Sequence, residues 1–332
     1  MLHSTAWTTR SPVVEPVAVV AILVDVAIGW PPALYARIGH PVGGFARLIG
    51  WAETRWNQSS SPASRRVAGV VTLLMIVAVA IGLSWLAATI ARLLLGDAAW
   101  IAIGLMAAPG LAIRSLHDHV VPVAQALEQG DLETARTRVA MIVGRDVAAL
   151  DEPGIARAAI ESLAESVCDG VVAPLFWLLV GGLPGLWAYK AINTADSLIG
   201  HREERWRAFG WAAARTDDLA NLIPARLSGV LLCLAGHAGL AGIAGHAGWR
   251  TMWRDAGKHA SPNAGWPEAA MAGALHLRLA GPIAYDGVRV AKPYIGEGRT
   301  AATAADIRAA LAIYRRACGL LLLIAGGIAW LL

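Results

Sequence analysis

The sequence predicts an all-α, polytopic integral membrane protein with about five transmembrane helices. Three observations lead to this fold class. The 332-residue chain is 56% hydrophobic and only 16% charged, whereas a soluble domain carries about 25% charged residues. Its apolar residues gather into long blocks, as membrane-spanning helices require. The two-residue alternation that marks a half-buried strand is nearly absent.

Six apolar blocks carry the predicted helices, and they lie at residues 17–30, 67–91, 98–113, 170–189, 222–247 and 317–332. A span needs about 20 apolar residues. The second and fifth blocks reach that length alone, whereas the third and the last need their flanking residues. Asp25 interrupts the first block, and no small-residue cleavage site follows it, so this block does not predict a signal peptide.

The block at 170–189 raises a problem of topology. Two spans between 31–66 and 114–169 return the chain to the side from which it started. One further crossing at 170–189 would place residues 190–221 on the opposite side, although their arginines favour the same, cytoplasmic side. The run GGLPG at 181–185 offers a solution, because it predicts a broken or re-entrant helix. The sequence leaves both topologies open.

Residues 1–332 form a single predicted membrane domain, whose polar segments lie between the apolar blocks at 31–66, 114–169, 190–221 and 248–316. Within the second segment, Gly130 and Asp131 predict the turn of a helical hairpin at 118–143. The net charge of +4 comes mostly from loop arginines. This pattern fits the cytoplasmic loops of a membrane protein and not nucleic-acid binding. The 3 scattered cysteines give no disulfide or zinc framework.

The first polar cluster that could carry chemistry precedes the block at 170–189. Arg157, Glu161, Glu165 and Asp169 follow one another at intervals of four residues along one side of a helix. Three carboxylates that lead into an apolar block are costly unless they are paired or bound to a metal. The alternative is structural, with an Arg157–Glu161 ion pair and an Asp169 that caps a helix.

The second cluster lies in the stretch YKAINTADS at 189–197. On a helix, Lys190, Asn193 and Asp196 share one face, and apolar residues fill the opposite face. A cation, an amide and an anion side by side suit a polar ligand. A solvated face at the membrane edge explains this single stretch equally well.

The third cluster, ARTDDLANLIPAR at 214–226, places Asp217, Asp218 and Asn221 close together on one helical turn and flanks them with arginines. Carboxylate oxygens suit Mg²⁺, which takes one or two carboxylates together with substrate phosphates. Arginines suit the phosphate oxygens. The alternative is that the two acids occupy the first turn of a helix that Thr216 caps.

The fourth cluster follows in KHASPNAGWPEAAMAGAL at 258–275. Its Ser261-Pro262-Asn263 run has turn chemistry, and Lys258 and Glu268 add charge on either side of the turn. The small residues after Glu268 allow close approach of a partner helix or a ligand. An ordinary capped loop is the alternative.

Two further features stand outside these clusters. Asp25 lies inside an apolar block and is therefore a functional candidate by default. His117 and His119 form an H-x-H pair that could bind a metal but is more typical of a polar loop. The chain has no G-x-x-x-x-G-K-[ST] motif, so the sequence does not support a Walker-type nucleotide site.

Six motifs, taken in order, resemble those of one protein family. They are GHPV at 39–42, IVGRD with LDE at 142–152, DGVVAPLFW at 169–177, YKAINTADS at 189–197, DDLANLIPARL at 217–227 and SPNAGWPEAAMAGAL at 261–275. A Lys-Pro pair at 292–293 fits as well. On these residues the chain resembles, over most of its length, the CobD/CbiB family of cobalamin-biosynthesis membrane proteins, the adenosylcobinamide-phosphate synthases. It departs from the usual residues of the family at Trp30, Val147 and Ser166.

The resemblance implies an activity. The family joins (R)-1-amino-2-propanol, or its O-phosphate, to a propionate carboxylate of adenosylcobyric acid. This ATP-dependent amide formation lies on the route to vitamin B12. We therefore expect an amide-forming ligase that crosses the cell (inner) membrane several times and uses ATP and Mg²⁺.

Such chemistry gives the clusters expected roles. Amide formation needs an activated carboxylate, cations that neutralise phosphate charge and a base that takes the ammonium proton. Lys190, Arg215 and Arg226 are expected to hold phosphates, and the base is expected to be Glu161 or Glu165. The expected metal ligands are Asp196, Asp217 and Asp218, and the expected catalytic residues are Glu161, Glu165 and Lys190. The expected substrate-binding residues are Asn193, Arg215, Asn221, Arg226, Lys258, Ser261, Asn263 and Glu268.

Two other functions stay open on the sequence alone. Intramembrane prenyltransferases hold Mg²⁺-diphosphate with paired aspartate-rich motifs, which NTAD and DDLAN resemble weakly. A transporter with broken helices is the non-enzymatic alternative, although no internal repeat is apparent. The sequence does not decide between the free and the phosphorylated amino alcohol, and it does not locate the ATP site. It also leaves the oligomeric state open, with a homo-oligomer as one option.

Overall fold

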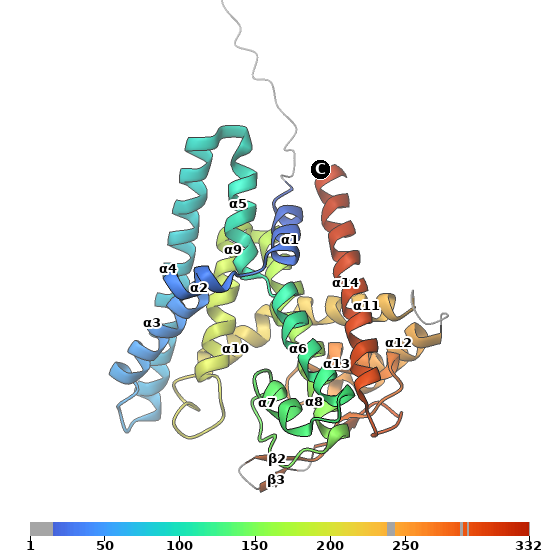
Figure 1. Cartoon of the computed structure of the whole chain (residues 1–332). Helices are drawn as coiled ribbons and strands as arrows, with labels where there is room; N and C mark the ends of the chain where they lie inside the picture. The colour runs from blue at the N-terminus through green and yellow to red at the C-terminus, as the bar shows by residue number, and fades with distance from the viewer. Residues whose placement is uncertain (1–15, 238–242, 286–287, 291, 332) are drawn as a thin grey trace, which may run out of the picture.

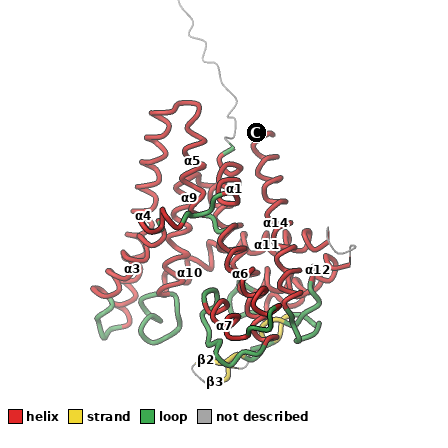
Figure 2. Tube along the Cα trace, in the orientation of Figure 1, coloured by secondary structure: helices red, strands yellow, loops and turns green. Residues whose placement is uncertain are grey.

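The structure is a computed structural model of the chain, and it describes residues 16–237, 243–285, 288–290 and 292–331. It confirms the predicted helical fold class. Strands are confined to short segments along one edge of the molecule (Figure 2). β1 (Leu279–Ala280) pairs antiparallel with β4 (Tyr294–Ile295), and β2 (Ile283–Tyr285) pairs antiparallel with β3 (Val288–Val290).

Within the described residues, 3 helical stretches are long and apolar enough to cross a membrane, or up to 5 if each bent helix pair counts as one span. The single stretches are Pro62–Glu128, Glu152–Ile199 and Ala304–Leu331, the last of which is α14. One bent pair joins α1 (Val17–Ala27) to α2 (Pro32–Ile38) and α3 (Pro41–Trp56), and the other joins α10 (Trp211–Ala220) to α11 (Leu222–His237). The predicted number of about five lies within this range.

The stretch Pro62–Glu128 is a hairpin of two upright arms, called the outer hairpin below. α4 (Pro62–Leu95) forms one arm, and α5 (Ala99–Ala107) and α6 (Ile113–Glu128) form the other (Figure 1). The turns η1 (Gly96–Ala98) and η2 (Ala108–Gly110) connect these helices. Gly96 has a φ of 53°, which glycine adopts without strain. The two ends of the outer hairpin therefore lie on the same side of the molecule, as predicted.

The stretch Glu152–Ile199 also folds back on itself and is called the inner hairpin below. α8 (Glu152–Val167) continues through a π-helical segment, η3 (Cys168–Val172), into α9 (Ala173–Ile199), which Gly182 breaks with a φ of 61° and a ψ of −157°. Beyond the break, a Cβ atom at Gly185 would lie 2.4 Å from the carbonyl oxygen of Trp177. Residues eight positions apart on a continuous helix are about 12 Å apart, so the chain reverses direction at Gly182.

This reversal bears on the topology that the sequence left open. On the returning arm, Lys190 Nζ lies 3.5 Å from the carbonyl oxygen of Asp169 on the first arm. The block at 170–189 is therefore a helical hairpin, which favours a re-entrant segment over a single crossing. Residues 190–221 return to the side that holds α7 (Leu132–Ala140) and the strands (Figure 1).

A crosswise layer of helices holds the block at 222–247, where the sequence predicted a span, and α11 passes as a candidate span only together with α10. α11 runs across the upright helices and ends at His237, and α12 (Ile243–Asp255) and α13 (Gly265–Ala274) pack against it (Figure 1). Residues 238–242 lie outside the described residues. The small residues of α13 allow close packing, since a Cβ atom at Gly273 would lie 2.5 Å from the carbonyl oxygen of Ala247 on α12. A helix that is packed on several sides is as apolar as a membrane span, so composition alone did not separate the two.

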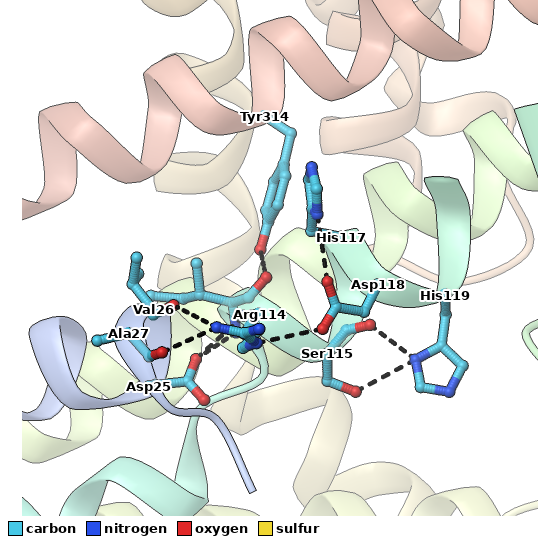
Figure 3. Close-up of polar contacts among 10 residues, drawn as sticks. Asp25, Val26, Ala27, Arg114, Ser115, His117, Asp118, His119 and Tyr314 are labelled. Atoms are coloured by element: carbon cyan, nitrogen blue, oxygen red, sulfur yellow. Dashed lines mark hydrogen bonds and ion pairs between the residues drawn. The ribbon is translucent and has the colours of Figure 1, made fainter. Parts of the chain in front are cut away.

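α1 and α6 cap each other. Asp25 Oδ2 accepts hydrogen bonds from the backbone N–H groups of Ile113, at 2.6 Å, and Arg114, at 3.3 Å. In return, the Arg114 guanidinium donates to the carbonyl oxygens of Val26, at 3.4 Å, and Ala27, at 2.8 Å (Figure 3). A carboxylate suits the start of a helix and a cation suits its end. The structure thus gives the intramembrane Asp25 a structural role.

The H-x-H pair on α6 makes separate local contacts. His117 Nδ1 lies 3.4 Å from Asp118 Oδ1, and His119 Nδ1 lies 2.7 Å from the carbonyl oxygen of Ser115 (Figure 3). The two rings therefore do not share a ligand position here, which favours the ordinary polar interpretation.

The predicted hairpin at 118–143 is confirmed. α6 ends at Glu128, Gly130 follows with a φ of 71°, and Asp131 Oδ1 accepts a hydrogen bond from the backbone N–H of Thr134 at 2.9 Å. Asp131 is thus the N-cap of α7, as its residue type predicted.

Candidate functional site

The π-helical segment η3 brings Asp169 to the returning arm of the inner hairpin. Asn193 Nδ2 on that arm donates to Asp169 Oδ2 at 3.2 Å and to Asp217 Oδ1 at 3.4 Å. One amide therefore joins η3, α9 and α10. Single π-helical turns inside α-helices, such as η3, are frequent at functional sites. Asp169 was absent from the expected ligands, although its place in the Glu161, Glu165, Asp169 series was a signal.

Asn221 holds the other oxygen of Asp217. Its Nδ2 donates to Asp217 Oδ2 at 2.9 Å, and its Oδ1 accepts a hydrogen bond from the Tyr189 hydroxyl at 3.0 Å. Asp217 and Asn221 are both buried. The two expected asparagines thus fix the carboxylate of one expected metal ligand.

The helix-capping alternative for the paired aspartates is wrong. α10 begins at Trp211, so Thr216 lies inside the helix and Asp217 and Asp218 lie towards its end. Carboxylates near the C-terminus of a helix meet the negative end of its dipole. Local helix stability therefore does not explain this pair.

A cavity of about 630 Å³, called the first cavity below, opens beside these aspartates. Its lining combines acids, arginines and the turn at 259–264. The acids are Glu165, Asp169, Asp196, Asp217 and Asp218, and the arginines are Arg202, Arg207 and Arg215. Arg215 lies 3.3 Å from Asp218 in an exposed ion pair. Three expected metal ligands and one expected phosphate ligand therefore meet at one cavity.

The turn before α13 closes one wall of the first cavity. Ser261 Oγ accepts hydrogen bonds from the backbone N–H groups of Asn263 and Ala264, at 3.2 and 3.3 Å. Asn263 Nδ2 donates to the carbonyl oxygen of Asp218 at 2.7 Å, and Arg226 donates to Asn263 Oδ1 at 3.0 Å. Ser261 and Asn263 line the cavity, whereas Arg226 supports it from behind.

Both expected lysines lie apart from the cavity surfaces. Lys258 Nζ forms an ion pair with Asp255 Oδ1 at 2.7 Å, and Lys258 is absent from the cavity lining. Lys190 is half-buried and absent from both cavity linings, and its Nζ lies 3.5 Å from the carbonyl oxygen of Asp169. The structure therefore brings neither lysine into the position that direct phosphate binding needs.

A second cavity, of about 1000 Å³, is lined by Glu161, Glu165 and Glu268. Arg145 forms an ion pair with Glu161 Oε2 at 2.7 Å, and the backbone N–H of Ala280 donates to Glu161 Oε1 at 2.8 Å. Arg157 instead donates to the carbonyl oxygen of Thr300. The predicted alternative, an Arg157–Glu161 pair, is therefore wrong.

The two cavities adjoin each other. The residues that line both are Glu165, His201, Arg202, His259 and Lys292. Of these residues, the sequence predicted a catalytic role for Glu165 and gave Lys292 only as part of a motif of the family. It also missed Arg145, because a pair between residues 145 and 161 depends on how the loop after α7 folds. The motif IVGRD was the only signal for this arginine.

Burial changes the titration of two groups that line the second cavity outside the membrane-spanning stretches. It raises the pKa of Glu268 well above its usual range, and the nearby Glu161 and Glu165 carboxylates raise it further. Burial lowers the pKa of His259, and the Lys292 cation adds to this effect. His259 is therefore neutral at pH 7.

The first cavity fits a magnesium–phosphate group better than a bare metal ion. Among the described residues, no group of three His, Cys, Asp or Glu side chains is placed to hold a metal by itself. Mg²⁺ needs only one or two carboxylates when phosphate and water complete its shell. Asp196, Asp217 and Asp218 offer carboxylates on one cavity, and the arginines around them suit the phosphate.

Comparisons with known proteins agree with these motifs. The family described as "CobD/Cbib protein" matches residues 18–314. The protein named "Cobalamin biosynthesis protein CobD" from Rhodobacter capsulatus is 50% identical over 317 residues, which cover 94% of this chain and 96% of that protein. Proteins of the same name from Sinorhizobium sp. and Brucella suis biovar 1 are 48% and 50% identical, over 90% and 89% of this chain and 93% and 90% of theirs.

No solved structure matches the chain. The family match nevertheless spans most of the sequence, and it includes every element that lines the two cavities. Because this family matches most of the sequence, and because the relatives are about 50% identical to the chain over nearly its whole length, the chain belongs to the CobD/CbiB family.

Proposed function

We propose that this protein acts in cobalamin biosynthesis as an ATP-dependent, amide-forming ligase. It would join (R)-1-amino-2-propanol, or its O-phosphate, to a propionate carboxylate of adenosylcobyric acid. The names of the relatives support the pathway. The reaction and the substrates are the ones that the family resemblance implies.

One observation carries the proposal: two adjoining cavities, each lined by acids and by cations, share Glu165 and Lys292. Amide formation from a carboxylate brings together a phosphate donor, an acid to be activated and an amine. The first cavity combines carboxylates with arginines, as a magnesium-bound phosphate requires. The second brings the carboxyl groups of Glu161, Glu165 and Glu268 to one cavity, which suits an amine.

The residues of the first cavity would hold the phosphates and their metal ion. When bound, Mg²⁺ would neutralise phosphate charge. One or two of the carboxylates of Asp217 and Asp218 on α10 and Asp196 on α9 would supply oxygens to it. Arg215 would bind phosphate oxygens from the rim, and Asn193 and Asn221 would fix the orientation of Asp217.

Glu165 is better placed than Glu161 to take the ammonium proton. Both Glu161 oxygens already accept hydrogen bonds, from Arg145 and from the Ala280 backbone. Glu165 lines both cavities, where an amine in the second could meet a carboxylate activated in the first. A general base must lie within hydrogen-bond reach of the proton it removes.

The proposed location is the inner cell membrane, crossed several times. The helical stretches that could span a membrane support a membrane protein. The lipid bilayer would be its environment, and a homo-oligomer stays an open option.

The test supplies purified protein in nanodiscs with adenosylcobyric acid, Mg-ATP and either amino alcohol. Mass spectrometry should detect the amide product, and the product should disappear when ATP is left out. A folded protein that forms no product with either amino alcohol would reject the proposed reaction.

Neither rival function gains support from the cavities. An apolar cavity of about 660 Å³, lined by Phe45, Leu83 and Trp187 among others, shares no residue with the two polar cavities. A prenyl-diphosphate substrate would need its apolar groove to continue from the aspartates. Uptake of a corrinoid into sealed vesicles without amide formation would instead favour the transporter.

A further inference from the structure

Glu268 on α13 faces the second cavity with one oxygen unpartnered. The residue is only 4% exposed, yet it lines the cavity. Its Oε2 atom has no hydrogen-bond partner within the described chain. A buried carboxylate without a donor is costly, so the unliganded residue holds its proton, as its raised pKa indicates. A ligand that brings positive charge and N–H donors into the cavity would take the place of that proton.

The other groups of the cavity do not supply that donor. Glu161 and Glu165 are carboxylates themselves, and both raise the negative potential around Glu268. Arg145, Arg202 and Lys292 also line the cavity, but Arg145 is engaged with Glu161 at 2.7 Å, and none of the three donates to Glu268 Oε2. The inner wall of the cavity thus holds more carboxylates than cations.

His259 lies close to Glu268 without bonding to it. His259 Nδ1 accepts a hydrogen bond from the backbone N–H of Ser261 at 3.0 Å, so the neutral ring carries its proton on Nε2. Nε2 lies 3.9 Å from Glu268 Oε2, which is beyond hydrogen-bond distance. A neutral ring at this distance neither neutralises nor satisfies the carboxylate.

We propose that Glu268 binds the ammonium group of the amine substrate, with Glu165 as a second acceptor. An ammonium group has N–H donors and no acceptor, which matches a wall of carboxylates. A metal ion fits less well, because no three side chains of the described residues are placed to hold one. Glu165 also lines the first cavity, so this site puts the amine nitrogen beside the place where the acid is activated. The inference rests on the proposed function for the identity of the amine.

The experiment is a ligand-observed NMR titration of the protein in nanodiscs. The probes are (R)-1-amino-2-propanol and (R)-1,2-propanediol, which has a hydroxyl group in place of the ammonium group. The proteins are the unmodified chain, Glu268→Gln and a control, Glu133→Gln, which removes an exposed carboxylate on α7. We expect Glu268→Gln to bind the amine at least about tenfold more weakly, as the loss of a charge-assisted hydrogen bond predicts. Glu133→Gln should bind it as the unmodified chain does.

Two results would each overturn the inference. One is a folded Glu268→Gln variant that binds the amine as tightly as the unmodified chain. The other is an unmodified chain that binds the diol as tightly as the amine, and this result does not depend on how well any variant folds.

The synthase assay separates this inference from the proposed function. If the unmodified chain makes no amide but binds the amine through Glu268, the proposed reaction fails and the ammonium site stands. If it makes the amide while Glu268→Gln still binds the amine normally, the site fails and the reaction stands.

Discussion

The outer hairpin, Pro62–Glu128, and the inner hairpin, Glu152–Ile199, show two ways to fold apolar sequence in a membrane. Both leave one side of the molecule and return to it. In the most apolar part of the outer hairpin 33% of the residues are buried, against 50% in the inner one. The outer hairpin exposes large apolar side chains, such as Leu83 and Trp85, that suit lipid. The inner hairpin carries charged and amide side chains.

The difference shows where a membrane protein can place polar chemistry. A charge that faces lipid is costly, whereas one covered by protein or lining a cavity is tolerated. The inner hairpin is enclosed by α4, α10 and α11, so Asp169, Asn193 and Asp196 face other protein groups or the first cavity. Irregular backbone at η3 and Gly182 is tolerated for the same reason.

The largest expected effect contrasts an aspartate of the site with one of the outer hairpin. Asp217→Ala should lower synthase activity at least about 100-fold, because the carboxylate that would hold the magnesium–phosphate group is lost. Asp118→Ala, which removes an exposed carboxylate on α6, should leave the activity unchanged. The rate of amide formation by each purified variant measures the contrast. Full activity in Asp217→Ala would remove the metal role from this residue.

Substitution of one glycine in each hairpin compares how closely the two hairpins are packed. Gly185→Ala places a Cβ atom 2.4 Å from the Trp177 carbonyl oxygen, whereas Gly82→Ala on α4 meets no atom within 4 Å. We expect Gly185→Ala to lower the free energy of unfolding by about 1–3 kcal/mol, as overpacking does. Gly82→Ala should be neutral or slightly stabilising, since alanine is the better helix former. Thermal unfolding followed by circular dichroism compares them, and equal transitions would contradict the close approach of the two arms.

Substitution of Asp25 tests whether this buried carboxylate, which lies outside the inner hairpin, contributes to stability and not to activity. Asp25→Ala removes the cap of α6 and should cost about 0.5–2 kcal/mol of stability. The activity per folded molecule should not change, since Asp25 lines neither polar cavity. Thermal unfolding and the synthase assay on the same preparation separate the two effects. Lost activity at unchanged stability would return Asp25 to the functional candidates.

The last contrast concerns pH. The raised pKa of Glu268 means that the folded state holds this proton more tightly than the unfolded state does. Its contribution to stability is therefore complete below the usual pKa of 4.5 and is lost as the pH rises towards the raised pKa. Relative to Glu268→Gln, the melting temperature of the unmodified chain should fall as the pH increases above 4.5. If the melting temperatures of the two proteins change in parallel from pH 5 to 8, the pKa of Glu268 is not raised.

Local spacing explains the part of the site that the sequence predicted. Asp217 and Asn221 are one helical turn apart, and the structure pairs them at 2.9 Å. The hairpin turn at Gly130 and Asp131 was predictable for the same reason. Each of these features depends on residues that are neighbours along one short segment.

Features that depend on distant segments were not predictable. Arg145 rather than Arg157 pairs with Glu161, because the fold and not the spacing sets this partner. Thr216 is a good capping residue by type, but α10 already begins at Trp211. The block at 222–247 is long enough to span a membrane. A helix that packs against other helices, as α11 does against α13, has the same apolar composition, so composition could not separate the two.

The reversal at Gly182 has a consequence for how the reaction is supplied. Asn57 at the end of α3 donates to the carbonyl oxygen of Arg205, Asn263 donates to the backbone of Asp218, and the backbone N–H of Ala280 donates to Glu161, so all four polar segments meet at one face. Nucleotide, corrinoid and amine would then all arrive from a single aqueous compartment, and none would have to pass through the bilayer. In sealed vesicles with mixed insertion, the molecules that face inward would be latent until a detergent opened the membrane.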